Sequence, residues 1–279
     1  MRNPCIEALS ILAKCSTVKK LKLRYRLLGD VAEDEGNIPA EALSHLTDLT
    51  VVDIPIQKLM QLKSFFARSS SLKTLDMQVE FTPNIPNVDI REVLPSDPHS
   101  SSLASLRGVH VRALGFSLSA EAAGCMRNLT ALHLENFSGS ELAPFWGAMR
   151  TRGVRLQVLE VLGVTRALVV YLASYSGLQH LKTAWVLPYQ KPELLPLADD
   201  IYGIVLRRHE DTVGSLRYSN GPSMGSWGVN EPILGNIIRC KKLRSLDLCF
   251  DTPPAVDYRI SDTSLVSEFP TRYAWSPDV

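Results

Sequence analysis

Apolar residues recur along the chain in one short pattern, in which an apolar residue is followed by two more at the third and fifth positions after it. The pattern occurs nine times between Val18 and Leu248, with Thr183 as its one polar member. The nine triads are Val18/Leu21/Leu23, Leu49/Val52/Ile54, Leu72/Leu75/Met77, Leu106/Val109/Val111, Leu129/Leu132/Leu134, Leu156/Leu159/Val161, Leu178/Leu181/Thr183, Val213/Leu216/Tyr218 and Leu243/Leu246/Leu248. The last two residues of each triad lie on the same face of a β-strand. The sequence therefore predicts nine short strands, each with one buried face.

The segments between the triads have the spacing of amphipathic helices, with apolar residues at three- and four-residue intervals. The clearest sets are Ile56, Leu59, Met60, Phe65 and Phe66 before the third strand, Ile201, Ile204 and Val205 before the eighth, and Ile233, Leu234, Ile237 and Ile238 before the ninth. Side chains suited to cap a helix N-terminus precede several intervening segments, namely Ser119, Ser140, Thr165 and Asn230. Strands and helices are therefore expected to alternate.

A strand and a helix that each have one apolar face bury both faces only by stacking on a neighbour. The triads begin about 28 residues apart on average, a period typical of solenoids. The sequence predicts an α/β solenoid shaped as a horseshoe, with about nine irregular repeats, a parallel strand ladder on the concave face and helices on the convex face. The predicted repeat domain covers residues 1–250, with loop insertions near 81–102, 187–198 and 219–232, followed by a C-terminal tail or cap over 251–279.

Three stretches of the chain resemble leucine-rich repeats of the irregular kind found in fungal and animal F-box proteins. The stretches are CSTVKKLKL (15–23), CMRNLTALHL (125–134) and CKKLRSLDL (240–248). In the cysteine-containing subclass of these repeats a cysteine lies about three residues before the first strand leucine, which Cys15 and Cys240 match and Cys125 misses by one residue. The asparagine that many such repeats place after the strand is absent, since Arg26, Gln57, Glu80 and Phe137 stand there.

The resemblance implies a protein-interaction scaffold that forms the substrate-recognition part of an F-box-type ubiquitin ligase receptor. An F-box would be a helical segment before the repeats, and here the first repeat begins close to Met1. Binding to a Skp-family adaptor is therefore expected only if an F-box lies upstream. The expected partner is a protein ligand of unknown identity.

Composition narrows the classes of function. The net charge is +1, charged residues are 21% and aromatic residues 7% of the chain, which argues against a nucleic-acid or anionic-membrane surface. Five cysteines without a CxxC pair are typical of reduced thiols. The sequence therefore favours a cytoplasmic or nuclear protein that binds neither nucleic acid nor membrane and needs no cofactor.

The candidate binding residues are the charged and imidazole side chains that the strand pattern turns toward the concave face. They are Lys20, Lys22, Arg24, Asp53, Asp76, His110, Arg112, His133, Glu135, Glu160, His180, Lys182, Arg217 and Asp247. This band of mixed charge suits recognition of a protein by charge complementarity. His110, His133 and Glu160 occupy the same position in consecutive units and have the chemistry of metal ligands, but a solvated surface is favoured because no surrounding residues would orient them as ligands.

Two alternative functions remain open. Gly221–Gly225 spell G-x-S-x-G with Ser223 as the candidate nucleophile of a serine hydrolase. All six histidines precede Ser223, whereas that hydrolase order places the histidine after the serine, and Pro222 stands inside the turn. We therefore predict a protein that is not an enzyme, with no catalytic residue. The second alternative is a structural repeat subunit of a larger assembly.

Overall fold

A computed structural model describes residues 17–24, 45–54, 59–60, 62–79, 88–94, 103–112, 116–135, 137, 142–185, 195–220 and 231–248 of the 279-residue chain.

Within the described residues, nine strands form one all-parallel sheet, and eight of these strands carry a predicted triad in the predicted register. The strands follow one another across the sheet in chain order, which is the connectivity of an open, solenoid-like α/β fold. They are β1 (Lys20–Arg24), β2 (Asp48–Ile54), β3 (Thr74–Val79), β5 (Gly108–Arg112), β7 (Ala131–Glu135), β8 (Val158–Leu162), β9 (His180–Trp185), β10 (Ser215–Asn220) and β11 (Ser245–Asp247).

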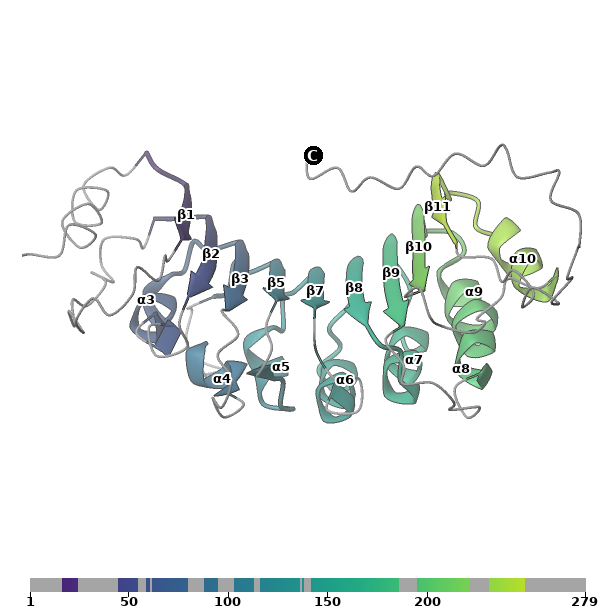
Figure 1. The fold of residues 1–279 in the computed structure, drawn as a ribbon, viewed down its shortest axis with the longest axis horizontal. Helices are drawn as coiled ribbons and strands as arrows, with labels where there is room; N and C mark the ends of the chain where they lie inside the picture. The colour runs from purple at the N-terminus through teal and green to yellow at the C-terminus, as the bar shows by residue number, and fades with distance from the viewer. Residues whose placement is uncertain are drawn as a thin grey trace, which may run out of the picture.

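Helices cover one side of this sheet. The strands stand along the inner side of a curved array and the helices lie along its outer side (Figure 1). The helices are α3 (Lys63–Arg68), α4 (Ile90–Val93), α5 (Ala122–Cys125), α6 (Ala143–Thr151), α7 (Arg166–Ala173), α8 (Leu195–Asp200), the π-helix η4 (Ile201–Val205), α9 (Leu206–His209) and α10 (Glu231–Ile238). We call the inner side the concave face and the outer side the convex face.

A backbone ladder joins successive units at the start of each strand. In each unit the carbonyl that follows the first triad residue accepts two N–H bonds from the next unit. The Lys19 carbonyl, for example, accepts from the N–H groups of Thr47 and Asp48 at 2.8 and 3.1 Å. The same arrangement continues through the carbonyls of Thr47, Lys73, Arg107, Thr130, Gln157, Gln179 and Gly214. This ladder fixes the register in which the units stack.

The core lies between the sheet and the helices and is built from the predicted triads. Leu132 and Leu159, in the middle of the stack, are fully buried, and so is Thr183, the polar member. The last triad is less enclosed, since Leu246 is 47% exposed. Burial of the alternate residues of each strand confirms the predicted assignment of buried and outward faces in the central units.

The predicted triad of the second unit is wrong by three residues. The buried set is Leu46, Leu49 and Val51, because Leu49 pairs with Leu21 and Leu75, and Val51 pairs with Leu23 and Met77. The register shifts between Val51 and Ile54, where Asp53 adopts a φ of 56°. The irregularity buries Val51 and Val52 in succession, so the alternation from which the strand face was predicted fails there.

The predicted helical stripes are partly correct. Thr165 is confirmed as the cap of α7, since its Oγ1 accepts from the Leu168 N–H at 3.2 Å, and the Ser119 Oγ accepts from the Ala122 N–H at 3.3 Å. Ile204 is 47% exposed and Ile238 80% exposed, although both were predicted on buried faces. In η4 the wider π-turn keeps Ile201 and Val205 buried and turns Ile204 outward. Ser140 and Asn230 lie outside the described residues.

Part of the predicted insertion at 81–102 is regular structure. Residues 88–89 form β4 (Val88–Asp89), which pairs in parallel with β6 (Phe116–Ser117), and α4 follows directly. Ile90, Val93 and Leu94 are buried in the core. This stretch therefore belongs to the convex layer of its unit, whereas residues 187–194, 221–230 and 251–279 lie outside the described part of the chain.

A row of aromatic rings joins the helices on the convex side. Trp146 stacks on Tyr171 at 5.5 Å between ring centroids, and Tyr175 contacts both Tyr171 and His209. The Nδ1 atom of His209 accepts from the Leu178 N–H at 3.2 Å, so Nε2 carries the proton toward the Leu172 carbonyl at 3.0 Å. Burial lowers the pKa of His209, which keeps this linking side chain neutral.

Replacement of Leu132 by alanine tests the core. Because Leu132 is fully buried, Leu132→Ala should lower the free energy of unfolding by about 2–5 kcal/mol through loss of contacts and formation of a cavity. Leu246→Ala removes the same side chain from the same strand position where it is 47% exposed, and should cost markedly less. Urea denaturation compares the two variants. Equal losses would show that the two strand positions are equally buried and contradict the packing described.

Candidate functional site

The outward side chains of the strands form a continuous row across the concave face. The parallel register places residues of equal position beside one another, about 4.8 Å apart. This central row consists of Lys22, Thr50, Asp76, His110, His133, Glu160, Lys182, Arg217 and Asp247. The structure therefore brings eight of the predicted site residues into one line.

Asp53 was predicted in this row, and the structure places Thr50 there instead. Asp53 lies beyond the register shift of β2, where its carboxylate is 3.8 Å from the Arg24 guanidinium at the end of β1. Lys20 and His180 lie at the starts of their strands and are exposed. Sequence reasoning missed Asp48, which pairs in register with Lys20 and became visible as an outward position only once the register of the second unit was known.

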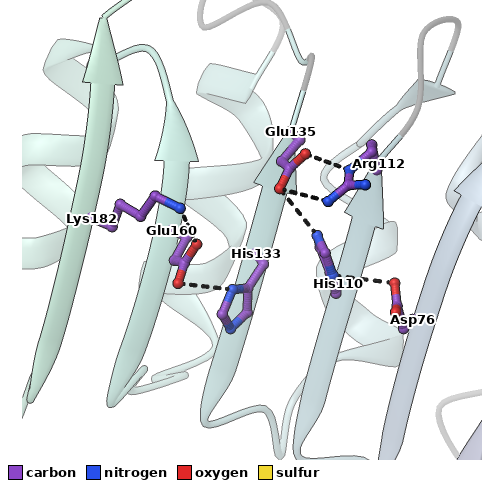
Figure 2. Close-up of polar contacts among 7 residues, drawn as sticks. All are labelled: Asp76, His110, Arg112, His133, Glu135, Glu160 and Lys182. Atoms are coloured by element: carbon purple, nitrogen blue, oxygen red, sulfur yellow. Dashed lines mark hydrogen bonds and ion pairs between the residues drawn. The ribbon is translucent and has the colours of Figure 1, made fainter. Parts of the chain in front are cut away.

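His110 is held between two carboxylates at the centre of the row. Its Nδ1 lies 3.1 Å from Asp76 Oδ1 on β3, and its Nε2 lies 3.4 Å from Glu135 Oε1 on β7 (Figure 2). Glu135 also accepts from Arg112 Nε at 2.5 Å and from Arg112 Nη2 at 3.3 Å, which is a bidentate pair. Four predicted residues from three neighbouring strands thus form one cluster.

A second group continues the row toward β9. His133 Nδ1 lies 3.3 Å from Glu160 Oε1, and the other oxygen of Glu160 accepts from Lys182 Nζ at 3.0 Å (Figure 2). The rings of His110 and His133 are in contact, with centroids 5.4 Å apart and a tilt of 53°. The seven side chains from Asp76 to Lys182 therefore form two polar groups joined by the ring contact of His110 and His133, and we call them together the network of the concave face.

The network shifts the pKa values of its members. The hydrogen bond with Asp76 raises the pKa of His110 against the opposing effect of burial, and the charges of Asp76 and Glu135 add to the rise. The hydrogen bond with His133, supported by Lys182, lowers the pKa of Glu160 to about 2. Burial acts to raise the pKa of Glu135, but the hydrogen bond and charge of Arg112 outweigh it and the pKa is lowered. The network therefore favours charged carboxylates and a protonated His110.

An open groove lies on the concave face over β1, β2, β3, β5 and β7. Its volume is about 700 Å³. Charged and imidazole side chains line it, namely Lys20, Lys22, Asp48, Asp76, Arg107, His110 and His133. Its floor is made of small residues, among them Thr74, Gly108 and Ala131, which lie side by side in the sheet. The N-terminal half of the concave face is therefore both hollowed and charged.

Three further sequence-based expectations concern a metal site, the serine loop and the membrane. No group of three His, Cys, Asp or Glu side chains suited to hold a metal occurs within the described ranges, and His110, His133 and Glu160 are engaged in the pairs given above. The candidate serine loop at residues 221–225 lies outside the described residues. Within the part of the chain that the structure covers, no helix is long and apolar enough to cross a membrane.

No protein-family model matches the chain. A comparison with curated proteins also finds no match. The site is therefore interpreted from its own geometry.

The lowered pKa of Glu160 predicts a pH-dependent contribution to stability. A carboxylate whose pKa falls from 4.5 to about 2 on folding stabilises the protein above pH 4.5, and this contribution is lost as the pH falls toward 2. Because the side chain is 32% exposed, Glu160→Gln should cost only about 1 kcal/mol at pH 6.

Urea denaturation of wild type and Glu160→Gln between pH 6 and pH 3 measures this contribution. The difference between the two proteins should shrink as the pH falls. Glu231→Gln on α10, outside the network, controls for general loss of a carboxylate. A difference that stays constant or grows toward pH 3 would mean that the folded protein does not hold the Glu160 carboxylate in its charged form.

Proposed function

We propose that the chain is a leucine-rich-repeat protein that binds a protein ligand on its concave face. The repeated triads and the single parallel sheet in chain order support the repeat assignment. The stretches at 15–23, 125–134 and 240–248 support it further, because these carry the resemblance to leucine-rich repeats. The concave face supports binding because it gathers charged side chains in a fixed geometry.

The groove over the first five strands of the sheet is the observation that carries the proposal. It is open to solvent, and ten of its fifteen lining residues are polar or charged, although apolar atoms make up most of its exposed surface. Sites for small molecules are usually enclosed and mostly apolar, with few polar groups. An open, charged groove that crosses several strands instead matches the polar surface that a protein partner covers.

The mixed charge of the concave face suits selection among protein partners. Lys20 and Lys22 lie at one end, and acidic, imidazole and basic side chains are mixed along the row, as in the neighbours Asp76 and His110 and the neighbours Glu160 and Lys182. Such a pattern attracts a complementary surface and opposes others by placing like charges together. The network also holds its members in defined positions, which lowers the entropy lost on binding.

The role in a ubiquitin ligase rests on the family resemblance alone. As a proposal, this chain would present a protein substrate through its concave face, and an F-box joined to the repeats would contact a Skp-family adaptor. Protein binding by the concave face stands without this role, since it needs only the groove and the network.

Obstruction of the concave face tests the proposed function. Ala131→Arg places a long side chain on the floor of the groove, and Ala67→Arg makes the same change on the exposed side of α3. Proteins captured by wild type and by Ala67→Arg should be recovered at least about tenfold less with Ala131→Arg, because interface obstruction removes binding free energy of this order.

Quantitative affinity capture followed by mass spectrometry measures the recovery, and thermal melts establish that both variants are folded. Ligands recovered equally with wild type and Ala131→Arg would place binding elsewhere and contradict the proposal. Selective loss with Ala67→Arg would contradict it as well, because that result would assign binding to the convex face.

A further inference from the structure

We propose that the groove over β1, β2, β3, β5 and β7 binds an extended acidic peptide segment of the partner protein, with its carboxylates at the β1 end. This inference rests on the proposed function and deepens it by naming the ligand chemistry. Three features of the groove carry it: its length, its floor and the balance of charge along its lining.

The length of the groove fits a short extended chain. Five neighbouring strands at about 4.8 Å spacing span about 19 Å from the first to the last. An extended chain advances about 3.3 Å per residue, so about six residues cross the groove. Such a segment lies across the strands on their side chains and needs no free sheet edge.

The floor allows a peptide backbone to come close to the sheet. Gly108 lies between Thr74 and Ala131 in register, so three small residues form a shallow step in the middle of the groove. A Cβ atom built on Gly108 would lie 3.7 Å from Thr74 Cγ2 and 3.9 Å from Ala131 Cβ, which is ordinary contact. The sheet therefore accepts a Cβ atom at position 108, and the space that glycine leaves open belongs to the groove.

The charge of the lining is positive, and it is most positive at the β1 end. Three cationic side chains, Lys20, Lys22 and Arg107, stand against the carboxylates of Asp48 and Asp76. The Asp48 carboxylate already accepts from Thr47 Oγ1 at 2.7 Å, and Asp76 is paired with His110. Lys20 and Lys22 lie on the same face of β1, about 7 Å apart along the strand, so both lie at the end of the groove that the terminal residues of a segment crossing the strands reach.

The same lining favours a peptide over a nucleic acid. Single-stranded nucleic acids bind in continuous positive grooves with aromatic side chains on which bases stack. Here Asp48 and Asp76 interrupt the positive charge, and no Phe, Tyr or Trp is among the described residues that line the groove. An acidic peptide can place neutral or hydroxyl residues over the two carboxylates, whereas a phosphodiester backbone brings a charge at every step.

A capped hexapeptide library, randomised at every position and selected on the immobilised full-length protein, tests the proposal. Wild type should enrich Asp and Glu at one end of the peptide by about fivefold or more, as expected for one or two well-placed charge pairs. The double variant Lys20→Glu/Lys22→Glu should reverse this preference to Lys and Arg. Lys63→Glu, which makes the same type of substitution once on α3, should leave the preference unchanged.

Gly108→Val places the site in the groove. Valine fits the strand but fills the step in the floor, so acidic peptides should bind at least about tenfold more weakly. Ser215→Val makes a comparable change at the same strand position of β10, outside the groove, and should bind as wild type does. Thermal melts within a few degrees of wild type verify that both variants are folded.

The outcomes separate this inference from the proposed function. No acidic enrichment, or enrichment that Gly108→Val leaves intact, overturns the inference. Tighter binding of a dT6 oligonucleotide than of the selected peptides, lost in the same variants, overturns it in favour of a nucleic acid. If a partner is still lost specifically with Ala131→Arg, the proposed function stands without the acidic ligand; if Ala131→Arg also has no effect, both fail.

Discussion

The rest of the structure depends on one interaction. At the start of each strand, a backbone carbonyl accepts hydrogen bonds from two N–H groups of the next unit. From Lys19 to Gly214, one carbonyl per unit accepts both the N–H of its counterpart in the next unit and the N–H that follows. Because backbone groups make these bonds, the ladder tolerates different side chains at this position from one unit to the next. Each unit is thereby held directly beside the last at the start of its strand, and the register shift of β2, between Val51 and Ile54, lies beyond this point. The loop lengths between units differ widely, and yet equal positions remain beside each other.

This constraint produces both the core and the concave face. On the buried side of each strand, the locked register stacks apolar side chains on one another, as with Leu132 between Val109 and Leu159. On the outward side it stacks His110 on His133 and sets Glu160 beside Lys182. Charged side chains about 4.8 Å apart repel one another if their charges are alike and pair if they are opposite, and in the central units they pair. The network in Figure 2 is therefore a consequence of stacking in register. The groove has the same origin, because short side chains happen to be stacked at three neighbouring positions.

Much of this fold can be predicted from the sequence because a period-two pattern identifies buried strand faces directly. The triads of the central units, the parallel order of strands and the cap at Thr165 are confirmed. The failures have local physical causes. Val51 and Val52 are both apolar and both buried at a register shift, so alternation chose the wrong start for the second unit. The π-turn at Ile201–Val205 changes the helical period and exposes Ile204. Residues 88–94 form buried structure within a stretch rich in proline and aspartate.

Most residues of the candidate site were predicted, apart from the missed Asp48 and the misplaced Asp53, but the connections between them were not. Strand alignment placed His110, His133 and Glu160 in one line, whereas the bidentate Arg112–Glu135 pair and the bridge from His110 to Glu135 depend on side-chain geometry. The groove depends on which small residues become neighbours, and that requires the register. The groove therefore forms where short side chains lie next to one another on neighbouring strands.

The contact between His110 and His133 tests the stacking register most directly, since it exists only if β5 and β7 align position by position. In a protein that is deuterated everywhere except at histidine, nuclear Overhauser effects between ring protons would detect this contact. The account predicts a cross-peak between His110 and His133, and none between His133 and His180, which lies two strands away at a different position. Absence of the first cross-peak, or presence of the second, would show that the units do not stack in this register.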